Sequence, residues 1–319
     1  MSIISRFQTI RNVGLSKALL FSIKNKLGIL ELERERDSIF FLLNNCIDIT
    51  KLPPTKDPDL RILQKCDALF LAIFDKICLK YGLTYWLDYG ALLGAIRHQG
   101  FIPWDDDIDI VMPREDFNKI PTLLKEVFDK YGFEVYDCPM HPIRGKIVSY
   151  DMEKTGVWLD IFPVDTFYTV DDENEARTML LKCITEYRLY LWNHLNESLE
   201  EMAGHKKVFL DKVSNGNTQY LVPSVEEWQG NHKLAVHKPE DIYPLKRVKF
   251  EDFKFNVPAD THKYVQRYIP NYMQFPHIAI NTHGKEGAET LSISQRAKHF
   301  GIDMNEVYEH LKSIYESVL

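Results

Sequence analysis

Cysteine is scarce in this sequence, and its spacing is irregular. Five cysteines are scattered over 319 residues, and no two of them have Cys-x-x-Cys spacing. A disulfide framework or a structural zinc site normally needs cysteines in even number and at close, regular spacing. We therefore expect neither, and we expect the reducing environment of the cytoplasm.

Long apolar runs and an excess of basic charge are missing as well. No run approaches the roughly 20 apolar residues that a membrane-spanning helix needs. No signal-peptide pattern with a cleavage site is found. The formal net charge of −7 argues against nucleic-acid binding, which depends on a basic surface. The sequence therefore predicts a cytoplasmic protein with no nucleic-acid partner.

Acidic residues are absent from residues 1–30, where basic side chains alternate with apolar ones. The basic residues are Arg6, Arg11, Lys17, Lys24 and Lys26, and the first acid is Glu31. This pattern is typical of an amphipathic helix that rests peripherally on an anionic membrane surface. A terminal helix packed on its own domain also explains the pattern, so both interpretations stay open.

Apolar periodicity predicts a first half in which strands and helices alternate. We expect helices at 31–50, 57–80, 90–97 and 114–130, and strands at 83–88, 107–111, 133–137, 146–150 and 157–165. We expect the second half to hold helices at 171–199, 201–213, 259–268 and 305–318, and a hairpin at 247–258. The predicted fold class is α/β (α+β), with a mixed sheet core and helical N- and C-terminal additions.

The most informative stretch is residues 101–112, in which four aspartates occupy five positions between aromatic and aliphatic side chains. In an extended segment alternate side chains share a face, so Asp107 and Asp109 should point the same way, roughly 6–7 Å apart. Two such carboxylates in a partly dry setting repel each other unless a cation lies between them. Oxygen ligands favour Mg²⁺, Mn²⁺ or Ca²⁺ over zinc.

A calcium loop of the EF-hand type fits this stretch poorly. Asp105, Asp107 and Asp109 match the first, third and fifth loop positions. The sixth position requires glycine but holds Ile110, and the twelfth requires glutamate but holds Asp116. A charged edge strand or an acidic turn remains the alternative without a metal.

A second acidic position lies in the predicted strand at 157–165. Asp160 should share a face with Trp158 and Phe162 in an otherwise apolar segment. A lone carboxylate there would cost several kcal/mol, so a metal, a reacting hydroxyl, a backbone cap or an arginine should accompany it. Asp165 follows Pro163 and is predicted to be a turn or cap residue.

Together, Asp107, Asp109 and Asp160 on neighbouring strands predict a site for phosphoryl transfer. Gly90 opens a predicted helix after a strand, where backbone N–H groups can bind a phosphate. Close packing is the alternative role of that glycine. The candidates for additional contacts with the substrate are Arg97, His98 and Lys146. A purely structural role for His98 also stays open.

The residues around these acids carry a family resemblance. Residues 85–114, YWLDYGALLGAIRHQGFIPWDDDIDIVMPR, closely resemble the signature of the LicD family of phosphotransferases, to which the fukutin-related proteins also belong. Residues 159–165, LDIFPVD, look like the second block of the family, and residues 244–258 and 264–276 look like its C-terminal pattern. Pro270 stands where the family usually has a glycine-containing turn.

This resemblance implies a nucleotidyltransferase-like fold and a Mg²⁺- or Mn²⁺-dependent transferase. The reaction would move a phospho-alcohol, phosphocholine or a polyol phosphate, from a CDP-activated donor to a hydroxyl of a cell-surface glycan. The acceptor would be a teichoic acid or lipopolysaccharide precursor, and CMP would be released. By matching position, Asp107 and Asp109 would bind the metal, Asp160 would be a base or a third ligand, and Gly90 would lie at the phosphate turn.

The resemblance also implies a division of the chain into an N-terminal helical extension at 1–55, a catalytic domain at 56–280 and a C-terminal helical segment at 281–319. Two other functions stay open. One is nucleotidyl transfer from a nucleoside triphosphate, and the other is glycan binding without catalysis on the same fold.

Overall fold

We describe the protein from a computed structural model. It describes residues 28–123, 125–137, 146–194, 216–223, 235–276 and 293–318, with isolated runs of one to three residues between 19 and 26 and between 201 and 211. Most of the basic segment at 1–30 and of the helix predicted at 201–213 lies outside the described residues.

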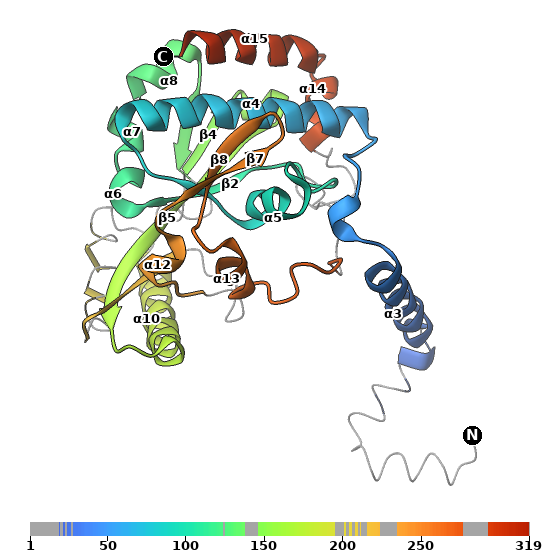
Figure 1. The fold of residues 1–319 in the computed structure, drawn as a ribbon, viewed down its shortest axis with the longest axis vertical. Helices are drawn as coiled ribbons and strands as arrows, with labels where there is room; N and C mark the ends of the chain where they lie inside the picture. Colours follow the sequence, from blue (N-terminus) through green and yellow to red (C-terminus); the bar gives the residue numbers. More distant parts are fainter. Residues whose placement is uncertain are drawn as a thin grey trace. The chain divides into compact units, whose positions relative to one another are not determined.

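Helices and strands alternate along the first half of the chain, as Figure 1 shows. The helices are α3 (Ile29–Cys46), α4 (Pro58–Tyr81), α5 (Tyr89–His98), α6 (Arg114–Phe117), α7 (Ile120–Leu123), α8 (Lys125–Tyr131), α9 (Met152–Thr155), α10 (Glu173–Asn193), α12 (Pro239–Ile242), α13 (Thr261–Gln266), α14 (Arg296–His299) and α15 (Met304–Ser317). Short 3₁₀ turns are η1 (Ile49–Lys51) and η2 (Ile293–Gln295). The strands are β1 (Trp86–Leu87), β2 (Asp109–Pro113), β3 (Glu134–Asp137), β4 (Lys146–Tyr150), β5 (Val157–Thr169), β6 (Thr218–Pro223), β7 (Lys246–Phe250) and β8 (Phe253–Val257).

Helix α4 is the longest described helix of the core, and its ends follow from the local sequence. The Asp57 carboxylate accepts hydrogen bonds from the backbone N–H groups of Asp59 and Leu60, and Pro58 occupies the first turn. Gly82, at φ 65°, ends the helix in the left-handed conformation that glycine adopts readily. Helix α4 packs against β5, and α15 packs along α4 (Figure 1).

The main sheet is mixed, in the order β1-β2-β5-β4-β3, and β6 pairs with the far end of β5. Only the β2–β5 pair is parallel among the described strand pairs. Strands β7 and β8 form a separate hairpin. The fold class predicted from the sequence, a mixed α/β core with additional helices, is confirmed.

One predicted helix is wrong. The segment at 114–130 forms three short helices, α6, α7 and α8, instead of one continuous helix. Pro121 lies inside this segment and has no backbone N–H to donate, so a continuous helix would lose a hydrogen bond there and clash with the preceding turn.

The interpretation of Asp165 as a turn or cap residue is also wrong, because β5 continues through Pro163 to Thr169. Strand β4 pairs with β5 as far as Ile161, and β6 begins to pair at Val164. Pro163 therefore falls in the gap between two neighbouring strands on that side, where its missing N–H costs no ladder bond. Asp165 is buried in the strand and pairs with Arg114.

The described chain divides into two compact units, one with residues 1–49 and 274–277 and the other with residues 50–273 and 278–319. Within the first unit, the Phe275 backbone N–H donates to the Asn44 side chain at 2.7 Å. No helix within the described ranges combines the length and the apolar character needed to cross a bilayer. The domain boundaries expected at 55 and 280 stay predictions.

Candidate active site

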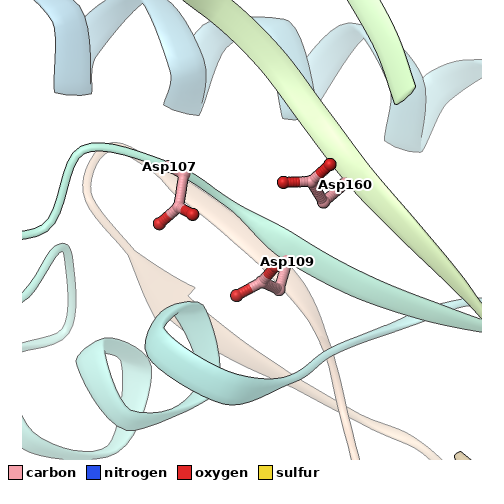
Figure 2. Close-up of side chains that lie close together, drawn as sticks. All are labelled: Asp107, Asp109 and Asp160. Atoms are coloured by element: carbon pink, nitrogen blue, oxygen red, sulfur yellow. The ribbon is translucent and has the colours of Figure 1, made fainter. Parts of the chain in front are cut away.

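The structure brings three carboxylates together where β2 and β5 run side by side. Asp107 lies just before β2, Asp109 is the first residue of β2, and Asp160 lies on β5 (Figure 2). One carboxylate oxygen from each residue lies within 4.8 Å of the other two. We call Asp107, Asp109 and Asp160 the acidic triad.

Strand register explains why the triad forms. Asp109 and Asp160 are direct partners in the parallel β2–β5 pair. The Asp160 backbone N–H donates to the Ile108 carbonyl at 3.0 Å, so the extended pairing continues ahead of β2. Ile108 and Ile110 are fully buried in the core, and the acids between and beside them share the opposite direction. Alternation along one strand and register with the next therefore assemble the site.

Trp158 orients the third carboxylate. Its indole N–H donates to Oδ2 of Asp160 at 3.0 Å. The two residues are separated by one position on β5, so they share a face of the strand, as the sequence predicts. A carboxylate held by a neighbouring donor loses less conformational freedom when it binds a ligand.

The donor set of the triad fits a hard divalent cation. Three carboxylate oxygens are the ligands that Mg²⁺ and Mn²⁺ accept, usually together with water and substrate phosphates. Asp107 is only 8% exposed, so mutual repulsion of the three acids is poorly screened by solvent. The three carboxylates could therefore hold a divalent metal ion.

A metal at the triad should stabilise the protein. We expect added Mg²⁺ or Mn²⁺ to raise the melting temperature of metal-free wild-type protein, with about 2.7 kcal/mol of stabilisation when the ion is at 100 times its Kd. Asp109→Asn should lose this response. Differential scanning fluorimetry against metal concentration measures it, and an equal response from wild type and variant would place the ion elsewhere.

Helix α5 begins beside the triad, and a carboxylate caps its first turn. The Asp88 side chain accepts from the Tyr89 backbone N–H at 2.8 Å, and the Asp88 backbone N–H donates to the Asp109 carbonyl at 3.1 Å. A Cβ atom on Gly90 would lie 2.4 Å from Oδ2 of Asp105. The missing side chain of Gly90 therefore leaves room for Asp105, while its predicted phosphate contact stays a prediction.

Asp88 is itself buried and holds two hydroxyl groups of the C-terminal part of the chain. The hydroxyls of Tyr264 and Tyr268 donate to its carboxylate, each at 2.9 Å. Burial raises the pKa of Asp88 to about 6, although the hydrogen bonds from Tyr89, Tyr264 and Tyr268 act in the opposite direction. Asp88 thus joins the start of α5 to α13 and its following turn.

This raised pKa predicts a pH-dependent contribution to stability. Because the folded protein binds the Asp88 proton more tightly than the unfolded chain, whose aspartate pKa is about 3.9, the contribution is full below about pH 4 and is lost as pH rises through about 6. Asp88→Asn keeps the cap and removes the titration. The difference in unfolding free energy between wild type and variant should change by about 2 kcal/mol between pH 4 and 7, measured by urea denaturation. Parallel pH profiles would contradict the assignment.

Two of the residues predicted to bind substrate, Arg97 and His98, lie in the last turn of α5. Arg97 is buried, and burial lowers the pKa of its guanidinium to about 10 against the opposing charge of Asp105. Burial and the charge of Arg97 lower the pKa of His98 to about 4. The His98 imidazole is therefore neutral at pH 7, so it is suited to neutral hydrogen bonding and not to neutralising the charge of a phosphate.

The third of these residues, Lys146, opens strand β4. It pairs with Ile161 of β5, and its neighbour Ile147 pairs with Asp160. Its backbone is thus one register position from the triad.

A further acid near the triad did not stand out in the sequence. Asp67 lies on α4 and is fully buried. Burial, followed by the charges of Asp107 and Asp106, raises its pKa well above the ordinary range, with the Trp158 backbone acting in the opposite direction. The signal was an acid on the apolar face of an amphipathic helix, three residues before Phe70 and four after Leu63.

Comparisons with known proteins show similarity to one family of transferases. Residues 82–188 match the family described as LicD/FKTN/FKRP, nucleotidyltransferase domain. Lipopolysaccharide cholinephosphotransferase LicD of Haemophilus influenzae is 25% identical over 245 residues, which cover 65% of this chain and 88% of that protein. Ribitol 5-phosphate transferase FKRP of Homo sapiens is 43% identical over 56 residues, which cover 16% of this chain and 11% of that protein. The uncharacterized protein RT0683 of Rickettsia typhi is 36% identical over 103 residues, 30% of this chain and 32% of that protein.

Proposed function

We propose, from the match of residues 82–188 to the LicD/FKTN/FKRP nucleotidyltransferase domain, that this chain transfers a phospho-alcohol from a CDP-activated donor to a glycan hydroxyl, with Mg²⁺ or Mn²⁺ at the acidic triad. The relatives are named as transferases of phosphate-containing groups, which supports phospho-group transfer in general. The CDP-activated donor, the metal ion and the glycan acceptor are our own proposals beyond that general activity.

The observation that carries the proposal is the convergence of the three triad carboxylates within 4.8 Å. Asp107 and Asp109 would hold the ion from one strand, and Asp160 would complete the set or accept the proton of the incoming hydroxyl. When bound, the metal supplies positive charge to the donor phosphate oxygens. The chain itself has to position the groups, and Trp158 does so for Asp160 through its hydrogen bond.

In the proposed reaction, the acceptor oxygen forms a bond to the phosphorus that carries the alcohol. The bond between that phosphorus and the oxygen of CMP breaks, and CMP leaves with the bonding electrons. The hydroxyl proton passes to Asp160 or to solvent. Asp160 suits this role because its carboxylate is held on the same side as Asp109, its register partner.

The test is CMP release from a panel of CDP-choline, CDP-ethanolamine, CDP-glycerol and CDP-ribitol, with and without lipopolysaccharide or teichoic acid as acceptor. We expect release from at least one donor, dependent on added Mg²⁺ or Mn²⁺. Pyrophosphate release from ATP or CTP without CMP release from any CDP-alcohol would favour nucleotidyl transfer. Metal binding without turnover of any donor would favour a non-catalytic glycan-binding protein.

We also propose that the protein works in the cytoplasm, peripherally on the inner face of the membrane through residues 1–30. The basic and acid-free composition of that segment supports contact with anionic lipid. Flotation with anionic and neutral liposomes tests it, comparing the full chain with a chain lacking those residues. Equal recovery of both proteins in the soluble fraction would contradict it.

A further inference from the structure

Three aromatic side chains from distant parts of the sequence meet at the start of α5. The rings of Tyr89 and Phe162 lie 5.8 Å apart between centroids, and those of Tyr89 and Tyr268 lie 5.9 Å apart. Each of the three residues is partly exposed. We call Tyr89, Phe162 and Tyr268 the aromatic corner.

The aromatic corner adjoins the acidic triad. Phe162 lies two positions after Asp160 on β5, so the two side chains share a face and are separated by roughly 6–7 Å along the strand. Tyr89 directly follows Asp88, whose backbone N–H donates to the carbonyl of the triad residue Asp109 at 3.1 Å. A donor whose phosphates lie at the triad would therefore extend its alcohol or its nucleoside over these rings.

The backbone at Tyr89 points to a requirement for its ring. Tyr89 has φ 42°, in the left-handed region that side chains other than glycine, asparagine and aspartate rarely adopt. The next residue, Gly90, could adopt this conformation readily, but the positive φ falls on Tyr89 instead. A bulky side chain in a disfavoured conformation next to an active site is a reason to look for a function of that side chain.

Ring geometry and charge indicate the kind of group that would bind. The rings of Phe162 and Tyr268 are inclined to that of Tyr89 by 74° and 62°, so they form walls and not a parallel platform for a flat base. The Tyr268 hydroxyl donates to the buried Asp88 carboxylate at 2.9 Å, which places negative charge behind the corner. Aromatic faces backed by carboxylates attract a compact cation, above all a quaternary ammonium.

We propose that the aromatic corner binds the trimethylammonium group of a choline-bearing donor. The proposal rests on the proposed function and makes it more specific, because it selects CDP-choline among the CDP-alcohols. The name of the Haemophilus influenzae relative, a cholinephosphotransferase, supports the same choice of alcohol. A polyol carries no charge and would gain little from these rings.

Steady-state kinetics with CDP-choline and with CDP-ribitol test the proposal. Phe162→Leu should raise KM for CDP-choline about tenfold and change KM for CDP-ribitol by less than about twofold, because only the cation loses its aromatic contact. Phe162→Tyr should restore the wild-type KM. Tyr89→Asn removes a second ring at a backbone conformation that asparagine tolerates, and it should act in the same direction.

Phe253→Leu is the matched control, since Phe253 is a partly buried ring at the start of β8 that contacts Tyr315 of α15. It should leave both KM values unchanged. Equal effects of Phe162→Leu on the two donors, or no effect on CDP-choline, would overturn the inference while the transfer activity stands. If no CDP-alcohol releases CMP, the proposed function fails, and calorimetry with phosphocholine decides the inference separately. Weaker binding by Phe162→Leu would then support it, and equal or undetectable binding would overturn it.

Discussion

Asp107→Asn should lower the rate of CMP release from a CDP-alcohol by about a thousandfold or more, equivalent to about 4 kcal/mol of transition-state stabilisation. An amide has nearly the shape of a carboxylate but lacks its charge, so the triad would hold a divalent cation poorly. Asp107 is one of the three acids whose oxygens lie within 4.8 Å. Turnover with saturating donor and metal measures the loss.

The matched control is Asp106→Asn. Asp106 is the adjacent residue and is also buried, but it is outside the group of converging carboxylates. We expect its turnover to fall by at most about ten- to a hundredfold, the range typical of residues that act through a ligand, and so by less than that of Asp107→Asn. The melting temperature of metal-free Asp107→Asn should stay near that of wild type or rise, because a repelling charge is removed. Unaltered turnover of Asp107→Asn would remove the triad from the mechanism.

Arg114→Ala should destabilise the fold by about 3 kcal/mol or more, because it leaves a buried carboxylate without its cation. The guanidinium of Arg114 donates two hydrogen bonds to Asp165, at 2.9 and 2.7 Å. The Asp165 side chain is 6% exposed and that of Arg114 is 20% exposed. The pair fixes α6 against the middle of β5, downstream of the triad. Urea denaturation at pH 7 gives the change in unfolding free energy.

Lys119→Ala is the control for this stability effect. Lys119 also pairs with an acid, Asp116, at 2.7 Å, but the lysine side chain is 45% exposed. An exposed pair contributes at most about 1 kcal/mol, so this variant should remain close to wild type. A similar small loss for Arg114→Ala would mean that the buried pair contributes no more than an exposed one.

The acidic triad could be predicted from the sequence because its residues follow patterns among positions close together in the chain. Alternation places Asp107 and Asp109 on one side of a strand, and an acid in an apolar strand singles out Asp160. Their direct pairing in register follows from the parallel contact between β2 and β5, which periodicity alone does not specify. The resemblance to the LicD family linked the two segments, because residues 85–114 and residues 159–165 both resemble blocks of its signature.

Long-range contacts could not be inferred in the same way. Asp88 receives hydrogen bonds from Tyr264 and Tyr268, which are 176 and 180 positions away in the chain. Strand β6 was not predicted, although its Tyr-Leu-Val core has β-forming residues, and it extends β5 beyond Pro163. Strand β5 changes its neighbour from β4 to β6 around Pro163, and for that reason Pro163 does not interrupt the strand. Such a change of neighbour is decided by the assembled sheet and cannot be seen in the local sequence.

The central claim is that the acidic triad supports a metal-dependent phospho-alcohol transfer. The most direct measurement is CMP release from the CDP-alcohol panel by the full chain after removal of metal with EDTA and again after Mg²⁺ or Mn²⁺ is restored. The account predicts no release from the metal-free protein, recovery in wild type on adding the ion, and no recovery in Asp107→Asn. Undiminished release without metal, or equal recovery in the variant, would contradict it.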